Sequence, residues 1–383
     1  MKKRILTLVT ILVLMLLSCV YGILIYRNQF FPYAIAKSLY STAKSLFYIG
    51  TGSSIDPDYL KTDVEGLILI EEPNDIDEMR TRLITFLWGT TGLPTNELPS
   101  EIEGDFKDER YADLFTSSLQ KIDRIVVDME FGLKSYIYHF MPKNNDNNKI
   151  VLFHQGHKGD FILNKELIGE LLDQGYSVAA FCMPLLGLNN RPIVYLPRFG
   201  YLKLRFHNHI RFLNPEHGNS LKYFVQPIVV FLNYANKNFN YEHVAMIGIS
   251  GGGWTTTLAA AVDTRIQSSF PVAGTEPMYI RSIGGNTGDW EQIDPELLRI
   301  SNYLEMYILG AYGGNRRQLQ ILNKFDPCCF AGVKWQTYKP TIRKRVEMLG
   351  KGSWDLFMDD SHTSHIISPV SRVEIFSTLK KAK

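Results

Sequence analysis

The sequence has 383 residues, of which 45% are hydrophobic, and its formal net charge is +2 at pH 7. This many apolar residues can form a sizeable core in one large domain or in two. The small net charge does not indicate binding to nucleic acid or to an acidic polymer, so we expect no nucleic-acid partner.

The chain begins with a basic segment that is followed by a long apolar one. Lys2, Lys3 and Arg4 precede an uncharged run over residues 5–26, which is long enough to span a bilayer as a helix. Basic flanking residues stay on the cytoplasmic side of a membrane. We therefore predict a signal anchor over residues 1–26, a single-pass protein, and an extracytoplasmic location for the rest of the chain.

Two alternatives stay open for this N-terminal segment. A cleaved signal peptide has a shorter apolar run and a small-residue cleavage site, and neither feature is found here. The sequence Leu-Leu-Ser-Cys at residues 16–19 resembles the cleavage box of bacterial lipoproteins, but the chain continues apolar as far as Tyr26. The transmembrane anchor is the preferred interpretation.

Residues 27–121 give a weaker pattern. The spacing of apolar residues predicts helices over 30–49 and 76–88, whereas 89–104 is rich in Gly, Pro, Thr and Glu and is predicted to be a loop. We interpret the region as an N-terminal extension that packs on the following domain.

From residue 122 onward, short apolar strands alternate with helices. An antiparallel hairpin is expected over 122–130 and 134–141, with its turn at Phe131-Gly132. Further strands are predicted over 150–153, 177–182, 268–272, 318–325 and 354–358, and helices over 164–174, 221–236, 255–262 and 369–379. This alternation predicts a mainly parallel sheet with helices on both faces.

Residues 243–254 combine a short apolar strand, a serine framed by glycines and the start of a helix. Gly248, Ser250 and Gly252 match the pattern G-x-S-x-G, which places a nucleophilic serine on a sharp strand-to-helix turn. Glycine at both flanking positions removes Cβ atoms that would clash across the turn. The alternative is an ordinary glycine-rich turn without chemistry.

A serine is a poor nucleophile near neutral pH unless a histidine takes its proton and a carboxylate holds the imidazole. His362 and His365 both follow the last predicted strand. We prefer His365 as the base, because it directly precedes the residues that lead into the closing helix, and His362 is the alternative.

Asp326 directly follows the predicted strand over 318–325. It completes the chain order Ser, Asp, His. We predict it as the acid of the triad. An aspartate before Pro327 also commonly shapes a turn, and Asp359 and Asp360 are the alternative acids.

The oxyanion that forms during such a reaction needs backbone donors. We expect the N–H groups of Gly251 and His157 to serve, since the helix after Ser250 offers free N–H groups and Gly156 allows a close approach. His154 and His157 are three residues apart with no acidic third ligand nearby, so we predict no metal site.

The adjacent residues Cys328 and Cys329 are a further feature of this region. Neighbouring cysteines rarely bond to each other for geometric reasons. We therefore expect both to be buried as small apolar groups.

Residues 122–383 resemble the α/β-hydrolase superfamily through the elbow at 248–252, the loop at 154–157, Asp326 and His365. Within it the chain is similar to carboxylesterases, acetyl-xylan esterases and dienelactone hydrolases, although the loop lacks the His-Gly-Gly-Gly form of lipases. The resemblance implies an α/β-hydrolase fold and a serine hydrolase that forms an acyl-enzyme without a cofactor. Its substrate is expected to be a small-molecule or glycan-linked ester.

Three alternatives to this function remain open. A peptidase or an acyltransferase can use the same fold, and so can a binding domain without catalysis.

Residues 275–317 interrupt the alternation of strands and helices and carry Gly284-Gly285 and Trp290. They are expected to form either a cap over the active site or a helical excursion without contact to substrate.

Overall fold

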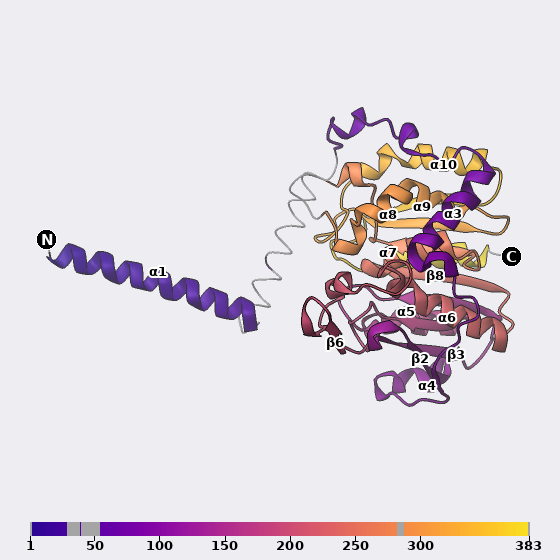
Figure 1. The fold of residues 1–383 in the computed structure, drawn as a ribbon, viewed down its shortest axis with the longest axis horizontal. Coiled ribbons are helices and arrows are strands. Elements are labelled where there is room, and N and C mark those ends of the chain that lie inside the picture. Colours follow the sequence, from indigo (N-terminus) through magenta and orange to yellow (C-terminus); the bar gives the residue numbers. More distant parts are fainter. Residues whose placement is uncertain (1, 29–38, 40–53, 282–286, 382–383) are drawn as a thin grey trace.

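In the computed structural model, positions are described for residues 2–28, 39, 54–281 and 287–381. A nine-stranded sheet with the order β1-β2-β3-β5-β4-β8-β9-β10-β11 lies at the centre (Figure 1). β1, β2 and β3 are antiparallel to their neighbours, and the strands from β5 to β11 in this order pair in parallel. The prediction of a mainly parallel sheet is therefore confirmed.

The strands of this sheet match most of the predicted ones within a few residues. Their bounds are β1 (Glu101–Glu103), β2 (Leu119–Asp128), β3 (Lys134–Pro142), β4 (Lys149–His154), β5 (Ser177–Phe181), β8 (His243–Ile249), β9 (Ser268–Val272), β10 (Arg317–Asn323) and β11 (Ser353–Asp359). The predicted hairpin is formed by β2 and β3, and its turn places Phe131 and Gly132 at φ values of 59° and 67°.

Helices cover both faces of the sheet. One face packs against α3 (Pro73–Trp88), α6 (Lys222–Asn238), α7 (Gly251–Val262), α8 (Pro295–Ile300), α9 (Tyr303–Ala311) and α10 (Lys339–Met348), and the other against α4 (Ala112–Ser117), α5 (Lys165–Asp173) and α11 (Pro369–Lys380). Successive side chains of a strand point to opposite faces. In β4, accordingly, Ile150 and Leu152 belong to one core, and Val151 and Phe153 belong to the other.

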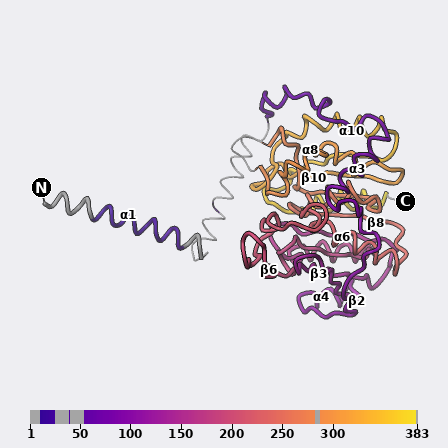
Figure 2. Tube along the Cα trace, in the orientation of Figure 1, coloured from indigo at the N-terminus to yellow at the C-terminus, as the bar shows by residue number. Residues whose placement is uncertain are grey.

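The chain before residue 122 contributes to the same fold. β1 and β2 both belong to the central sheet. β1 and the first residues of β2 fall within residues 27–121, the segment predicted as an extension. The helix α3 from the same early part of the chain lies against α8, as Figure 2 shows. Arg80 donates to the carbonyl oxygens of Ala261 and Leu309 at 2.9 and 3.0 Å, and Arg345 donates to that of Ile70. These bonds tie α3 and the residues before it to the helices α7, α9 and α10.

The described part of residues 275–317 includes the helices α8 and α9, and every residue of α9 is buried. The cap expected for this segment stays a prediction from the sequence. α9 packs against α7, with Tyr307 bonded to Thr275. A helix that is apolar on all sides must be enclosed by the fold, so α9 is a core helix.

Several elements are not expected from the sequence. β1 lies within residues 89–104, which are predicted to be a loop. A small separate hairpin of β6 (Ile193–Leu196) and β7 (Gly200–Lys203) follows β5 in the chain. The helix α10 lies between β10 and β11. The predicted helix over 30–49 lies outside the described residues, apart from residue 39.

The N-terminal helix α1 (Lys2–Asn28) covers the predicted anchor and lies apart from the sheet in Figure 1. Its described side chains, at residues 10–24, are all exposed. Among the described residues, no helix combines the length and the apolar character that a membrane span requires. The predicted transmembrane anchor is therefore not confirmed, and the extracytoplasmic location stays a prediction from the sequence.

Candidate active site

Ser250 lies at the sharp turn between β8 and α7. β8 ends at Ile249 and α7 begins at Gly251, and the backbone of Ser250 has φ 57° and ψ −126°. A residue with a Cβ atom is strained in this conformation, and such strain is typical of functional sites. The turn projects the serine from the carboxyl ends of the parallel strands, as the G-x-S-x-G pattern predicts.

The glycines around Ser250 allow three backbone segments to meet. A Cβ atom at Gly248 would overlap the carbonyl oxygen of Gly252, and one at Gly252 would overlap that of His154. At Gly156, a Cβ atom would lie 2.5 Å from the carbonyl oxygen of Ile249 and 2.7 Å from Cβ of Ser250. Glycine at these positions therefore lets the loop after β4 approach the serine turn closely.

Asp326 and His365 form a buried hydrogen-bonded pair. Nδ1 of His365 lies 2.7 Å from Oδ2 of Asp326, and the two residues are 8% and 1% exposed. Oδ1 of Asp326 accepts the backbone N–H groups of Cys328 and Cys329 at 2.8 and 3.0 Å. Since a carboxylate only accepts hydrogen bonds, Nδ1 carries the proton and Nε2 is the acceptor. Nε2 has no hydrogen-bond partner among the residues that the structure describes.

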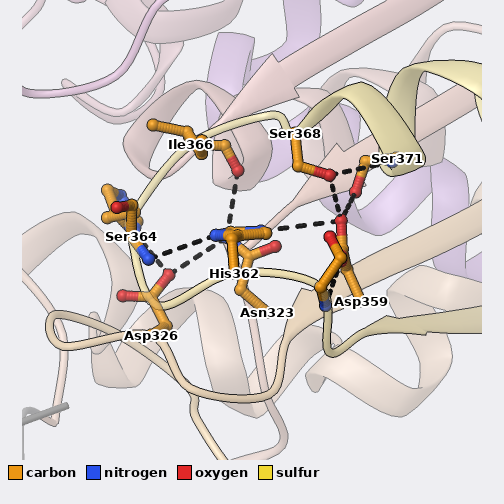
Figure 3. Close-up of polar contacts among 10 residues, drawn as sticks. Asn323, Asp326, Asp359, His362, Ser364, Ile366, Ser368 and Ser371 are labelled. Carbon is orange, nitrogen blue, oxygen red and sulfur yellow. Dashed lines mark hydrogen bonds and ion pairs between the residues drawn. The ribbon is translucent and has the colours of Figure 1, made fainter.

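His362 belongs to a different polar group. Its Nε2 lies 3.5 Å from Oδ2 of Asp359, and its Nδ1 accepts the backbone N–H of Ser364. Asp359 also accepts hydrogen bonds from the hydroxyl groups of Ser368 and Ser371, and Figure 3 shows these contacts on the side of the view opposite to Asp326. Two separate acid–histidine pairs are thus present.

The pKa of Asp359 reflects this network. Burial acts to raise it, but hydrogen bonds from Ser361, Ser368 and Ser371 lower the pKa of Asp359 to about 2. The carboxylate is therefore ionised near neutral pH, and its lone pairs are occupied by hydroxyl groups of its own loop and helix.

Ser250 and His365 line the same cavity, which has a volume of about 230 Å³. Within the described part of the chain, the lining comprises Gln155, Gly156, Lys158, Leu163, Asn164, Ile249, Ser250, His365 and Ile366. Neither His362 nor any described residue of 275–317 is part of this lining. The cavity therefore combines the serine of the elbow with the preferred histidine.

Comparison with solved structures identifies this architecture. The acetyl xylan esterase from Paenibacillus sp. R4 superposes with a TM-score of 0.54 and 15% identity, over 84% of this chain and 98% of that one. The chain has the α/β-hydrolase fold. Acetyl xylan esterase 1 from Thermoanaerobacterium sp. JW/SL YS485 gives a TM-score of 0.51 and 12% identity, over 81% of this chain and 94% of that one.

A third structure with this fold is the methylesterase BT1017, with a TM-score of 0.56 and 13% identity, over 87% of this chain and 66% of that one. No family model and no curated protein matches the sequence. The TM-scores of 0.51–0.56 show the shared fold. At identities this low the activity must be argued from the site.

The two predicted oxyanion donors lie close together. Gly251 is the first residue of α7, so its N–H has no acceptor within the helix. The ring of His157 lies against it, since a Cβ atom at Gly251 would be 2.5 Å from Cε1 of His157. Neither residue lines the cavity, and their role as donors stays a prediction.

The surroundings of His157 differ from the expectation that no acid is near. Its Nε2 lies 3.0 Å from Oε1 of Glu291, a residue 134 positions later in the chain, and its Nδ1 lies 3.4 Å from Oδ2 of Asp289. The argument against a metal at this histidine is therefore wrong, because the fold brings in carboxylates that are distant in sequence.

Cys328 and Cys329 also differ from the expectation. They are joined by a disulfide bond, Cys328 is exposed and Cys329 is half-buried. The turn after Asp326 lies at the protein surface, so the two side chains are not enclosed as apolar groups. Their sulfur atoms lie within 4.8 Å of a ring nitrogen of His365, which places the disulfide next to the histidine of the buried pair.

Proposed function

We propose that this protein is a serine hydrolase that cleaves carboxylic esters. One observation carries the proposal: the buried Asp326–His365 pair and the strained Ser250 meet at one cavity. A serine, a histidine and a carboxylate in this chain order and on this fold form the machinery of acyl transfer.

In the proposed reaction, Oγ of Ser250 attacks the acyl carbon of the ester. Nε2 of His365 takes the serine proton and later gives it to the departing alkoxide, while Asp326 holds Nδ1–H and stabilises the imidazolium. A water molecule, activated by the same nitrogen, then attacks the acyl-enzyme and releases the acid. The N–H groups of Gly251 and His157 are the proposed donors to the oxyanion.

The cavity supports a substrate with a short acyl group. Its volume of about 230 Å³ is below the range of roughly 300–1,000 Å³ that is typical for drug-sized ligands. Leu163, Ile249 and Ile366 supply apolar surface, while Gln155 and Asn164 supply polar groups. Two of the similar structures are acetyl xylan esterases, so we propose an acetyl group on a sugar or another small alcohol.

A panel of substrates tests this function. We expect kcat/KM for p-nitrophenyl acetate to exceed that for the octanoate by at least about tenfold, since one methylene in a pocket is worth about 1–3 kcal/mol. Acetylated xylo-oligosaccharide should release acetate. Preferential cleavage of a peptide amide would instead indicate a peptidase. No turnover of any ester by the folded full-length protein would favour a binding domain.

A further inference from the structure

A second group of chemically active side chains lies next to the proposed active site. Four residues, here called the His157 cluster, come from three separate segments of the chain. They are His157 in the loop after β4, His207 at the start of the 3-10 helix η7 (His207–Phe212), Asp289, and Glu291 in the 3-10 helix η9 (Trp290–Gln292). One nitrogen or oxygen atom from each lies within 4.8 Å of the others.

The individual distances describe a compact set of donors. Nε2 of His157 is 3.0 Å from Oε1 of Glu291. Nε2 of His207 is 3.7 Å from an oxygen of Asp289 and 3.7 Å from Oε2 of Glu291. The two imidazole rings are 4.3 Å apart between their centroids. Each histidine therefore faces both carboxylates.

The burial of Glu291 indicates that the cluster is incomplete without a ligand. Glu291 is 0% exposed, and its Oε2 has no hydrogen-bond partner within the described ranges of the chain. Nε2 of His207 is likewise buried and unbonded there. A buried carboxylate oxygen without a hydrogen bond is costly, whereas a cation at the centre of the cluster would satisfy both atoms.

We propose that the His157 cluster binds one divalent transition-metal ion, with Zn²⁺ as the best fit. Two imidazoles and two carboxylates form a four-ligand set that Zn²⁺ accepts in tetrahedral geometry. Bonds of about 2.0–2.1 Å to a tetrahedral ion place the ligand atoms roughly 3.3 Å apart. The observed separations of 3.0 and 3.7 Å lie on either side of that value. Mg²⁺ and Ca²⁺ prefer oxygen ligands.

Four protein ligands leave no open position, so the ion has a structural role. It joins the loop after β4 to η7 and η9, segments that are distant in sequence. The ring of His157 touches the start of α7 at Gly251, so the ion also fixes the loop beside Ser250. The alternative is a metal-free cluster with a protonated histidine. Burial acts against protonation, but the hydrogen bond to Glu291 raises the pKa of His157 overall.

Metal content and affinity of the full-length protein test the proposal without any enzyme assay. After chelator treatment and dialysis, titration with Zn²⁺ in a calorimeter should give one site per chain, and Zn²⁺ should raise Tm. Co²⁺ in the same site should give the visible absorption of tetrahedral coordination. Loss of a residue that only supports a metal ligand typically weakens metal binding by about 10- to 100-fold. His207→Ala and Glu291→Gln each remove a ligand, so each should weaken Zn²⁺ binding by more than that.

The matched control is His217→Ala, which removes an exposed histidine outside the cluster and should leave Zn²⁺ affinity unchanged. Circular dichroism checks folding, and His207→Gln replaces His207→Ala if the latter does not fold. Absence of a Zn²⁺ site in the folded wild-type protein would overturn the proposal in favour of protonated histidines. Equal affinity of the wild type and the two cluster variants would also overturn it.

Discussion

Replacing His365 with alanine should lower kcat/KM for an activated acetyl ester by at least about 10⁴-fold. His365 is the residue that the fold bonds to Asp326 and places on the cavity with Ser250. Ser250→Ala should show a loss of similar size. The double variant should be no worse than either single one, because residues that act as a unit do not contribute additively.

His362→Ala is the matched control for the histidine. This side chain lies in the Asp359 network and is not part of the cavity lining, so we expect at most about a tenfold change in kcat/KM. All variants are measured with the same ester after circular dichroism has shown that they are folded. If His362→Ala were as inactive as Ser250→Ala while His365→Ala kept its turnover, the base would be the other histidine.

Replacing Asp326 with asparagine should preserve the fold and lower kcat by about 10⁴-fold. Oδ1 of Asp326 accepts two backbone N–H groups, so the oxygen of the new amide stays at that position. Its NH₂ group then faces Nδ1 of His365, which can no longer donate a proton there. The ring must carry its proton on Nε2, where it cannot accept the proton of Ser250.

Asp359→Asn is the control for the acid. Hydrogen bonds hold the pKa of Asp359 at about 2, below the value of about 3.9 in an unfolded chain. Its stabilising contribution is therefore present above pH 4 and is lost as the pH falls towards 2. The variant should have a lower Tm at neutral pH and a nearly unchanged kcat. Loss of turnover in Asp359→Asn, with normal turnover in Asp326→Asn, would assign the acid to Asp359.

The sequence predicts best those features that are determined by residues close together in the chain. The elbow is one example, because the apolar strand, the glycines and the following helix lie within residues 243–254. The predicted bounds of β9, residues 268–272, agree with the observed ones. The choice of His365 over His362 had a weaker local basis, and only the fold brings His365 and Asp326 together across 39 positions.

The features that the sequence does not predict depend on distant contacts or lack a periodic pattern. α9 has no polar face, so its sequence gives no amphipathic period. α10 is strongly charged and buries only a few residues, among them Ile342 and Val346. The carboxylates beside His157 come from 289 and 291, and nothing in the local sequence of the histidine indicates them.

Labelling with a fluorophosphonate probe tests the central claim most directly, because this probe reacts with serines that an adjacent base has activated. The account predicts one probe per folded full-length chain, attached at Ser250 in the peptide mass spectrum. Labelling should be absent in Ser250→Ala and strongly slowed in His365→Ala. Attachment at another serine, or an active esterase that does not react at Ser250, would contradict the account.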